Sequence, residues 1–177
     1  SSLSPASLMT LLINSLIKQE QKTTDEKLIS SENIRFEKSK ILLIEDDVIN
    51  QRVMERMLNK LGIEVEIATN GTDGFNLASK NNYDLILTDY HLPGKSGLNI
   101  LEELKKLKGK KLPPIIILTA NALEEHKEKF MSIGAAHYLV KPINFSSLIN
   151  TLSKWLKFSN KPQTKKLAIV VMLVIGI

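Results

Sequence analysis

The strongest constraint on the fold is a regular alternation of short apolar runs and amphipathic segments that begins at Ile41. The apolar runs are rich in Ile, Leu and Val, as is typical of strands buried on both faces of a sheet. The segments between them carry apolar residues at helical spacing. The expected strands are residues 41–44, 65–68, 85–89, 115–118 and 137–140. The expected helices are residues 48–61, 72–80, 98–107, 122–133 and 145–156.

Five strand–helix units predict a parallel sheet with helices on both faces, because parallel neighbours are joined by right-handed crossovers. The strand at residues 65–68 is half polar, as an edge strand would be. In the first helix, the apolar residues at helical spacing are Val53, Met54, Met57, Leu58 and Leu61, and Gly62 ends the segment. We therefore expect a doubly wound α/β domain over residues 39–158.

Length and composition set limits on the rest of the chain. Its 177 residues suffice for one domain with extensions, and 43% hydrophobic with 24% charged residues is typical of a globular protein. The absence of cysteine excludes disulfides and zinc–thiolate sites, and it fits a reducing cytoplasmic location. The net charge of +5 comes from lysines scattered among nearly as many acids, so we expect no direct nucleic-acid binding.

The two extensions differ from the central domain in composition. Residues 1–38 are expected to form a helical connector and linker, with Ser4 as the cap of its helix and Pro5 at the first helical position. This connector either dimerises, joins a preceding domain, or is the remainder of a neighbouring domain. The sequence opens without Met or a leader, so we expect a piece of a longer chain without a secretory signal.

Residues 159–177 are expected to be a basic linker followed by an apolar tail. The tail, residues 167–177, is shorter than the roughly 20 residues that a membrane helix needs. It is either the start of a spanning segment with lysines on the cytoplasmic side or a foreign end. Membrane contact is therefore expected only through this tail, and the location is cytoplasmic, with tethering to the membrane as the alternative.

Two of the expected strands end in carboxylates. The first runs into Glu45-Asp46-Asp47 and the third ends at Asp89. In open α/β sheets, reacting groups lie just past the carboxyl ends of the strands. Adjacent acids are costly to hold together without a cation, and oxygen ligands completed by water suit Mg²⁺. Asp47 is better explained as the cap of the helix that follows, and a turn-capping role is the alternative for Asp89.

The chain resembles a receiver domain of the two-component response-regulator family over residues 39–158. Five features carry the resemblance in order: Glu45-Asp46, Asp89 within Leu87-Thr88-Asp89-Tyr90-His91-Leu92-Pro93, then Gly97, Thr119-Ala120 and Lys141-Pro142. Asn50, and Asn121 within Thr119-Ala120-Asn121-Ala122, are most similar to the receivers of hybrid histidine kinases. The resemblance implies a flavodoxin-like, five-stranded parallel sheet of order 2-1-3-4-5 with five helices.

The resemblance also implies roles for individual residues. Asp89 would be the phosphoacceptor. Mg²⁺ would be bound by Asp46, Asp89 and the backbone carbonyl of His91, with Glu45 acting through water. Lys141 would contact the phosphoryl oxygens. Thr119 and Tyr138 would form a switch pair.

The chemistry of phosphoryl transfer agrees with these roles. Charge is spread over three equatorial oxygens in the transition state, so catalysis consists mostly of positioning and electrostatic stabilisation. A carboxylate can accept the group as an acyl phosphate, which adds about −1.5 to −2 of charge. A hydroxyl on the neighbouring strand can then be drawn toward the new oxygens.

The predicted function is phosphorelay signalling. The donor would be a phosphohistidine on a histidine kinase or a histidine phosphotransfer domain, and a homodimer is a further expected partner. The domain would assist its own phosphorylation and dephosphorylation, and the full-length chain could be a hybrid histidine kinase. Phosphorylation would change the face formed by the fourth helix, the fifth strand and the fifth helix.

Two alternatives remain at this point. A haloacid-dehalogenase-like phosphatase also uses a nucleophilic Asp, but it needs a second acid where this chain has His91. A receiver that only binds, without phosphate, is opposed by the intact Asp89, Thr119 and Lys141. We expect His137 to be packed rather than catalytic, and Trp155 to lie in the core or at an interface.

Overall fold

The computed structural model describes residues 4–12, 34–107, 109, 111–121 and 123–159, which belong to two compact units divided after Ile34. In the first unit, residues 5–12 are helical, and the hydroxyl of Ser4 accepts a hydrogen bond from the amide of Ser7, as expected of the cap. The predictions for residues 13–33 and 160–177 lie outside the described residues. Among the described helices, none is both long and apolar enough to cross a membrane.

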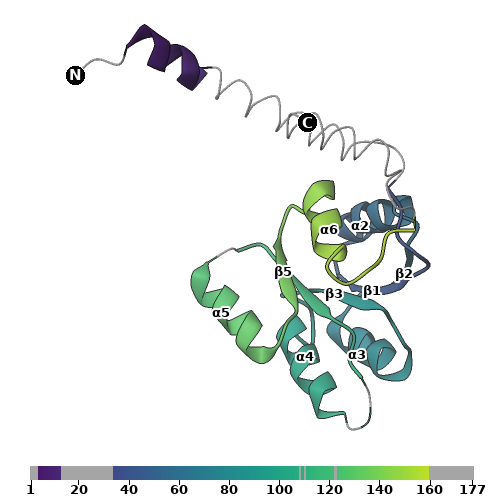
Figure 1. Cartoon of the computed structure of the whole chain (residues 1–177). Helices are drawn as coiled ribbons and strands as arrows, with labels where there is room; N and C mark the ends of the chain where they lie inside the picture. The colour runs from purple at the N-terminus through teal and green to yellow at the C-terminus, as the bar shows by residue number, and fades with distance from the viewer. Residues whose placement is uncertain (1–3, 13–33, 108, 110, 122, 160–177) are drawn as a thin grey trace. The chain divides into compact units, whose positions relative to one another are not determined.

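The second unit is built on a five-stranded parallel sheet of order β2-β1-β3-β4-β5, which confirms the predicted flavodoxin-like fold. The strands are β1 (Lys40–Ile44), β2 (Glu64–Ala68), β3 (Leu85–Asp89), β4 (Ile115–Thr119) and β5 (His137–Val140). The helices are α2 (Val48–Lys60), α3 (Gly71–Lys80), α4 (Gly97–Lys106), α5 (Glu124–Ile133) and α6 (Phe145–Leu152). Helices α2 and α6 lie on one face of the sheet, and α3, α4 and α5 lie on the other (Figure 1).

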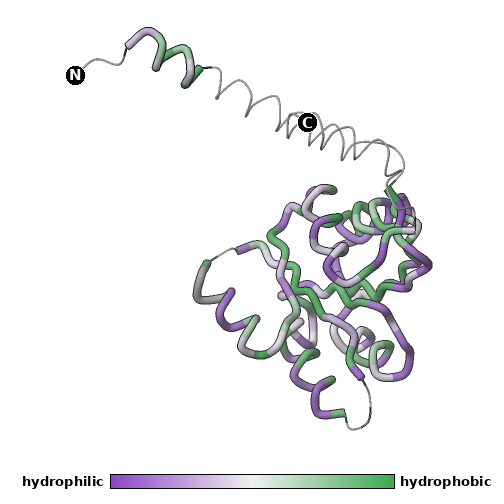
Figure 2. Tube along the Cα trace, viewed as in Figure 1, coloured by the Kyte–Doolittle hydropathy of each residue, from purple (hydrophilic) through white to green (hydrophobic). Residues whose placement is uncertain are grey.

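Burial follows this layered arrangement. Almost every residue of β1, β3 and β4 is buried, because helices cover both faces of these central strands. The resulting apolar band runs through the middle of the unit (Figure 2). Strand β2 lies at one edge and carries the exposed Glu64, as its half-polar sequence predicted. Because all five strands are parallel, their carboxyl ends lie together at one end of the sheet, which we call the carboxyl edge. Their amino ends lie together at the opposite end, the amino edge.

The face that α2 buries contains only some of its apolar residues. Met54 and Leu58 are buried, but Val53 is 48% exposed, and Gln51 is buried in its place. Successive residues of a helix are rotated by about 100°, so positions 51, 54 and 58 face the sheet together while position 53 points away. Helix α2 thus carries apolar residues on two sides, and only one of these sides packs on the sheet.

Two helix ends differ from the prediction by more than one residue. Helix α5 begins at Glu124 rather than at residue 122, and the side chain of Asn121 accepts a hydrogen bond from the amide of Leu123 just ahead of it. Helix α6 ends at Leu152 rather than at residue 156. The amide of Trp155 bonds to the Leu152 carbonyl three residues back, as in a tight 3₁₀-type turn, and the chain leaves the helix there.

The segments that flank the sheet pair with each other. Phe36 and Phe158 form an isolated antiparallel bridge, and their rings stack with centroids 4.7 Å apart. The amide of Glu37 donates to the Lys157 carbonyl at 2.7 Å, and the amide of Phe36 donates to the Leu61 carbonyl at 2.9 Å. We call this pairing the terminal clasp. Since Phe36 precedes β1 and Leu61 follows α2, the clasp lies at the amino edge of the sheet.

Candidate functional site

Three carboxylates meet at the carboxyl edge of the sheet. Glu45 and Asp46 directly follow β1, and Asp89 ends β3, which pairs with β1 through Ile44 and Thr88. Oxygens of the three acids lie within 4.8 Å of one another. We call these residues the acidic cluster. The structure thus brings together the three carboxylates that the sequence selected.

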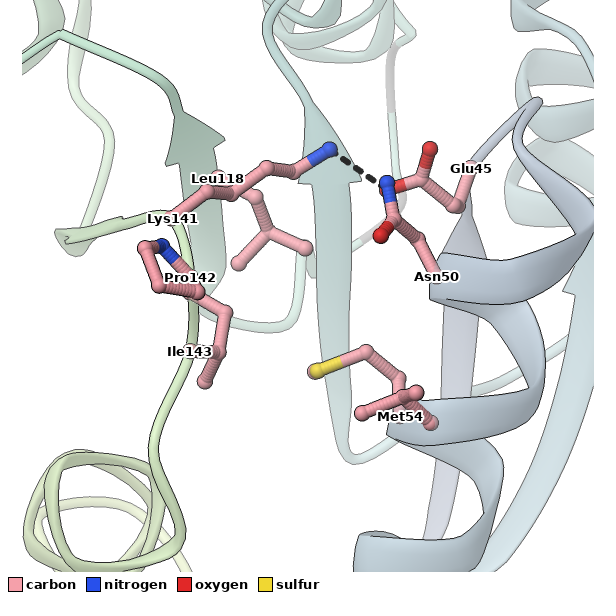
Figure 3. A pocket seen from close by; sticks show the side chains of 8 residues that line it. Glu45, Asn50, Met54, Leu118, Lys141, Pro142 and Ile143 are labelled. Carbon is pink, nitrogen blue, oxygen red and sulfur yellow. Dashed lines mark hydrogen bonds and ion pairs between the residues drawn. The ribbon is translucent and has the colours of Figure 1, made fainter.

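Lys141, just past the end of β5, reaches across the sheet into the acidic cluster. Its Nζ donates to Glu45 Oε2 and to Asp89 Oδ2, each at 2.6 Å, and the bond to Glu45 is drawn in Figure 3. The backbone amide of Lys141 donates to the Thr119 carbonyl at 2.8 Å, which anchors the residue at the end of β4. The ammonium therefore compensates the negative charge of two of the three acids.

Burial and pairing act in opposite directions on the ionisation of this pair. Burial raises the pKa of Glu45 by more than its hydrogen bond from Lys141 lowers it, so the pKa lies above its ordinary value. Burial lowers the pKa of Lys141, but the hydrogen bonds to Asp89 and Glu45 outweigh that effect and leave this pKa raised. Lys141 therefore carries its charge at neutral pH.

The backbone orients the two buried acids. Glu45 is 1% exposed, and its Oε1 accepts a hydrogen bond from the Asp47 amide at 3.2 Å. Asp89 is 8% exposed, and its Oδ1 accepts from the His91 amide at 3.2 Å. Asp46 is exposed, so the cluster is open to solvent on one side. Hard oxygen donors with room for water are the ligand set that Mg²⁺ prefers, and these residues fit that ion.

Gly97 lets the backbone pass close to Asp89. The amide of Gly97 donates to the Tyr90 carbonyl at 3.1 Å, and a Cβ at this position would lie 2.5 Å from the Asp89 carbonyl oxygen. No side chain fits there without movement of the main chain. This contact gives a physical reason for glycine at the position that the sequence had selected only through a resemblance.

The structure separates the roles of the two neighbouring acids Asp46 and Asp47. Asp47 is the N-cap of α2, and its side chain accepts from the Asn50 amide at 2.8 Å, as predicted. We expect Asp47→Ala to lower the free energy of unfolding by about 1 kcal/mol and to leave Mg²⁺ affinity intact. Asp46→Ala is expected to abolish measurable Mg²⁺ binding. Calorimetric titration of both variants tests the assignment, and an equal loss of affinity in the two would overturn it.

Thr119 and Tyr138 lie on the neighbouring strands β4 and β5. Thr119 is 2% exposed, and its hydroxyl is hydrogen-bonded to the backbone of Asn121 at 3.2 Å. The ring of Tyr138 lies 6.2 Å from that of Phe130, and the Lys127 ammonium lies 5.9 Å from its centroid. Tyr138 therefore packs on α5, while Thr119 sits at the carboxyl edge beside Lys141.

His137 directly precedes Tyr138 in β5, and the centroids of their rings lie 5.6 Å apart. The His137 ring lies 6.3 Å from that of Trp155, and both side chains are half-buried. Burial, together with the charges of Lys154 and Lys127, lowers the pKa of His137. These contacts agree with the predicted packing role.

An apolar pocket adjoins the acidic cluster between α2 and the segment after β5. Its volume is about 190 Å³, and Glu45 and Lys141 line its polar end (Figure 3). The rest of its wall consists of Asn50, Val53, Met54, Leu118, Pro142 and Ile143. The exposed apolar residues Val48 and Ile49 lie on the first turn of α2.

Sequence reasoning missed Gln51 as a residue of this site. Its buried amide donates to the Glu45 carbonyl at 2.7 Å. The signal that could have found it is its position, because residue 51 falls on the buried helical stripe of Met54 and Leu58. A polar residue on that stripe requires a hydrogen-bond partner inside the protein.

Comparison with known proteins adds evidence from outside this chain. The family model of the response regulator receiver domain matches residues 41–153. The hybrid signal transduction histidine kinase G of Dictyostelium discoideum is 34% identical over 74% of the chain, which corresponds to 4% of that protein. The chain spans only 4% to 52% of the length of the first curated relatives that it matches.

Solved structures give the same picture. The receiver domain of the sensor histidine kinase PA1611 from Pseudomonas aeruginosa, described with a magnesium ion in its active-site cleft, is 36% identical with a TM-score of 0.62; the match covers 67% of this chain and 98% of that one. The receiver of Ssk1, solved with the histidine phosphotransfer protein Ypd1 of Saccharomyces cerevisiae, is 29% identical with a TM-score of 0.62; the match covers 68% and 90%.

Proposed function

The chain belongs to the response regulator receiver domain family of two-component phosphorelays, and from this membership we propose that Asp89 accepts a phosphoryl group from a phosphohistidine. The observation that carries the proposal is the position of Asp89 at the end of β3, within one cluster with Glu45 and Asp46 and bonded to Lys141. We assign Mg²⁺ to Asp46 and Asp89 directly and to Glu45 through water. The carbonyl of His91 completes the proposed ligand set.

The proposed reaction is a single displacement at phosphorus. A carboxylate oxygen of Asp89 forms a P–O bond as the P–N bond of the donor phosphohistidine breaks, and the imidazole leaves. Bound Mg²⁺ supplies positive charge to the phosphoryl oxygens. Lys141 supplies a second positive charge, because its ammonium already lies against Asp89 at 2.6 Å. Glu45 and the His91 amide hold the ammonium and the acceptor in position.

The donor must approach from the open side of the cluster, and the surface there suits a protein. Val48, Ile49 and Val53 are exposed apolar residues of α2, and Ile49 is 72% exposed. Val53 also lines the pocket that Glu45 and Lys141 close at its polar end. We propose that a helix of a histidine phosphotransfer or kinase domain packs on this surface. The complex of the Ssk1 receiver with the histidine phosphotransfer protein Ypd1 supports this kind of partner, and the exposed apolar residues of α2 support the position.

Ile49→Asp tests this docking surface. We expect phosphotransfer from a phosphorylated histidine phosphotransfer domain to slow about tenfold, because a charge replaces an apolar contact worth roughly 1.4 kcal/mol. Phosphorylation by acetyl phosphate should not change. Met131→Asp is the matched control, since Met131 is an exposed apolar residue on α5. If both variants slow equally, the docking surface is not on α2.

A second part of the proposal concerns the response to phosphorylation. We assign Thr119 and Tyr138 as the residues that pass the change to the face formed by α5, β5 and α6. The hydroxyl of Thr119 can leave Asn121 for the phosphoryl oxygens, because its residue ends the strand beside Asp89. A phosphoryl group can bias such an equilibrium only through contacts that differ between the two states.

Thr119→Ala is the test of this switch. We expect the variant to accept phosphate at Asp89, because the acidic cluster and Lys141 remain. It should lose most of the change in hydrogen exchange over residues 136–148 that a beryllofluoride mimic of the phosphoryl group produces in the wild type. The same mimic-induced change in both proteins would show that Thr119 does not transmit the signal.

The chain spans only part of the length of its relatives, so we also propose its place in a larger protein. We propose that it is the receiver of a hybrid histidine kinase. The support is the match to the Dictyostelium kinase and to sensor histidine kinase RcsC, of which the chain covers 13%. Sequencing the complete reading frame and finding no kinase core would contradict this context without touching the receiver assignment.

A further inference from the structure

We infer that Gln51 is a positioning residue for the magnesium site, whose side-chain amide holds the main chain at Glu45 so that the acidic cluster stays assembled. The inference rests on the proposed function, because it concerns the same cluster. The side-chain amide of Gln51 donates to the Glu45 carbonyl, so Gln51 acts through Glu45.

The geometry singles out this side chain. Gln51 is 9% exposed and lies in the second half of the first turn of α2, on the stripe that also buries Met54 and Leu58. Its Nε2 donates to the Glu45 carbonyl at 2.7 Å. A buried amide is costly unless it is hydrogen-bonded, so an apolar residue would be the ordinary choice at this position. The bond that Gln51 makes identifies what the amide is needed for.

Glu45 is held through its main chain as well as its side chain. Its amide donates to the Ala68 carbonyl of β2 at 3.0 Å, and its carbonyl accepts from Gln51. Its two carboxylate oxygens accept from the Asp47 amide and from Lys141. The peptide group after Glu45 leads directly into Asp46, so the bond from Gln51 also restrains the main chain that carries the exposed carboxylate of Asp46.

The acidic cluster needs such a tether because its members repel one another. Oxygens of three carboxylates lie within 4.8 Å, and like charges at that distance oppose each other strongly in a partly buried site. Lys141 contacts Glu45 and Asp89. The hydrogen bond from Gln51 of α2 to the Glu45 carbonyl holds the main chain at the acidic cluster in place without adding charge. Outer-shell partners of this kind commonly change metal affinity about tenfold or more when removed.

The test compares Mg²⁺ affinity in variants of the whole 177-residue chain by calorimetric titration with MgCl₂. Gln51→Met keeps the side-chain length and removes the donor, and we expect the dissociation constant for Mg²⁺ to rise about tenfold. Gln51→Asn shortens the side chain by one methylene, so its amide no longer reaches the Glu45 carbonyl and Mg²⁺ affinity should fall in the same way. This variant replaces Gln51→Met if the methionine variant does not fold. Leu58→Val is the matched control, because it disturbs the same buried stripe of α2 away from the acids.

A second readout uses the protein without Mg²⁺. The Asp47 amide donates to Glu45 Oε1, so its hydrogen exchange reports whether Glu45 keeps its place. We expect faster exchange at this amide in Gln51→Met than in Leu58→Val. If Gln51 had only a structural role, Gln51→Met and Leu58→Val would both change stability. Gln51→Met would then not selectively speed exchange at the Asp47 amide or weaken Mg²⁺ binding.

The possible results distinguish a failure of the positioning role of Gln51 from a failure of the proposed function. If the wild type binds Mg²⁺ and either folded Gln51 variant binds it equally well, the positioning role is wrong and the proposed function stands. An affinity loss that Leu58→Val reproduces also overturns the positioning role. If the wild type does not bind Mg²⁺, the proposed function fails and the inference fails with it.

Discussion

Asp89→Asn is expected to abolish phosphorylation by acetyl phosphate in the presence of Mg²⁺. The neutral amide is a poor nucleophile, and the substitution removes one of the charged ligands that we propose for Mg²⁺. The other two acids are not equivalent replacements: the ion pairs of Lys141 are with Glu45 and Asp89 rather than with Asp46, and both carboxylate oxygens of the buried Glu45 are already hydrogen-bonded. Intact-mass measurement should show a phosphate adduct on the wild type and none on the variant.

Folding is not expected to limit this experiment. Removal of one carboxylate relieves repulsion within the acidic cluster, so the variant should be at least as stable as the wild type. Asp84→Asn is the matched control. Asp84 directly precedes β3, and its side chain accepts from the Lys40 amide at 2.7 Å at the other edge of the sheet. An adduct on Asp89→Asn, or its loss from Asp84→Asn as well, would refute the assignment of the acceptor.

Lys141→Ala is expected to have two large effects. Without Mg²⁺, the free energy of unfolding should fall by about 3 kcal/mol, because the buried Glu45 and Asp89 lose their shared cation. Added Mg²⁺ should restore much of this loss, since it supplies the missing charge. Phosphorylation at Asp89 should be much slower even with Mg²⁺, because one of the two positive charges at the phosphoryl oxygens is gone. Urea denaturation with and without Mg²⁺ measures the first effect.

The pH at which Lys141→Ala should be compared with the wild type follows from the ionisation of Lys141. Its folded pKa is raised above the ordinary 10.5, so the stability it contributes is fully present below that value and is lost only as the pH rises through the folded pKa. Denaturation near neutral pH therefore measures the full contribution. Lys95→Ala is the control, because Lys95 forms a more exposed ion pair with Glu103. An equal loss of stability in both variants would contradict the special role of Lys141.

Much of the scaffold could be predicted from local pattern. Strands buried on both faces must be almost wholly apolar, so β1, β3 and β4 were recognisable as continuous runs of Ile and Leu. Asp47 was recognisable as a cap because a short acceptor directly precedes an amphipathic segment. The strand order came from the resemblance, since local sequence does not specify which strands are neighbours.

The features that escaped prediction depend on contacts between distant parts of the chain. Whether Val53 or Gln51 faces the sheet depends on which side of α2 the rest of the protein covers. The bonds from Lys141 join residues that are 96 and 52 positions apart. The pairing of Phe36 with Phe158 is equally remote in sequence. Periodicity within one segment contains no information about such partners.

Because of the terminal clasp, the receiver unit begins and ends at the same place on its surface. The chain enters at Phe36 and leaves at Phe158, and these residues are neighbours at the amino edge, away from the acidic cluster. Domains whose ends adjoin tolerate insertion into other chains and circular permutation. Fusions joined at either end are therefore tethered on the side away from Asp89. The same geometry would let such a unit move between host proteins with the open side of the acidic cluster left accessible.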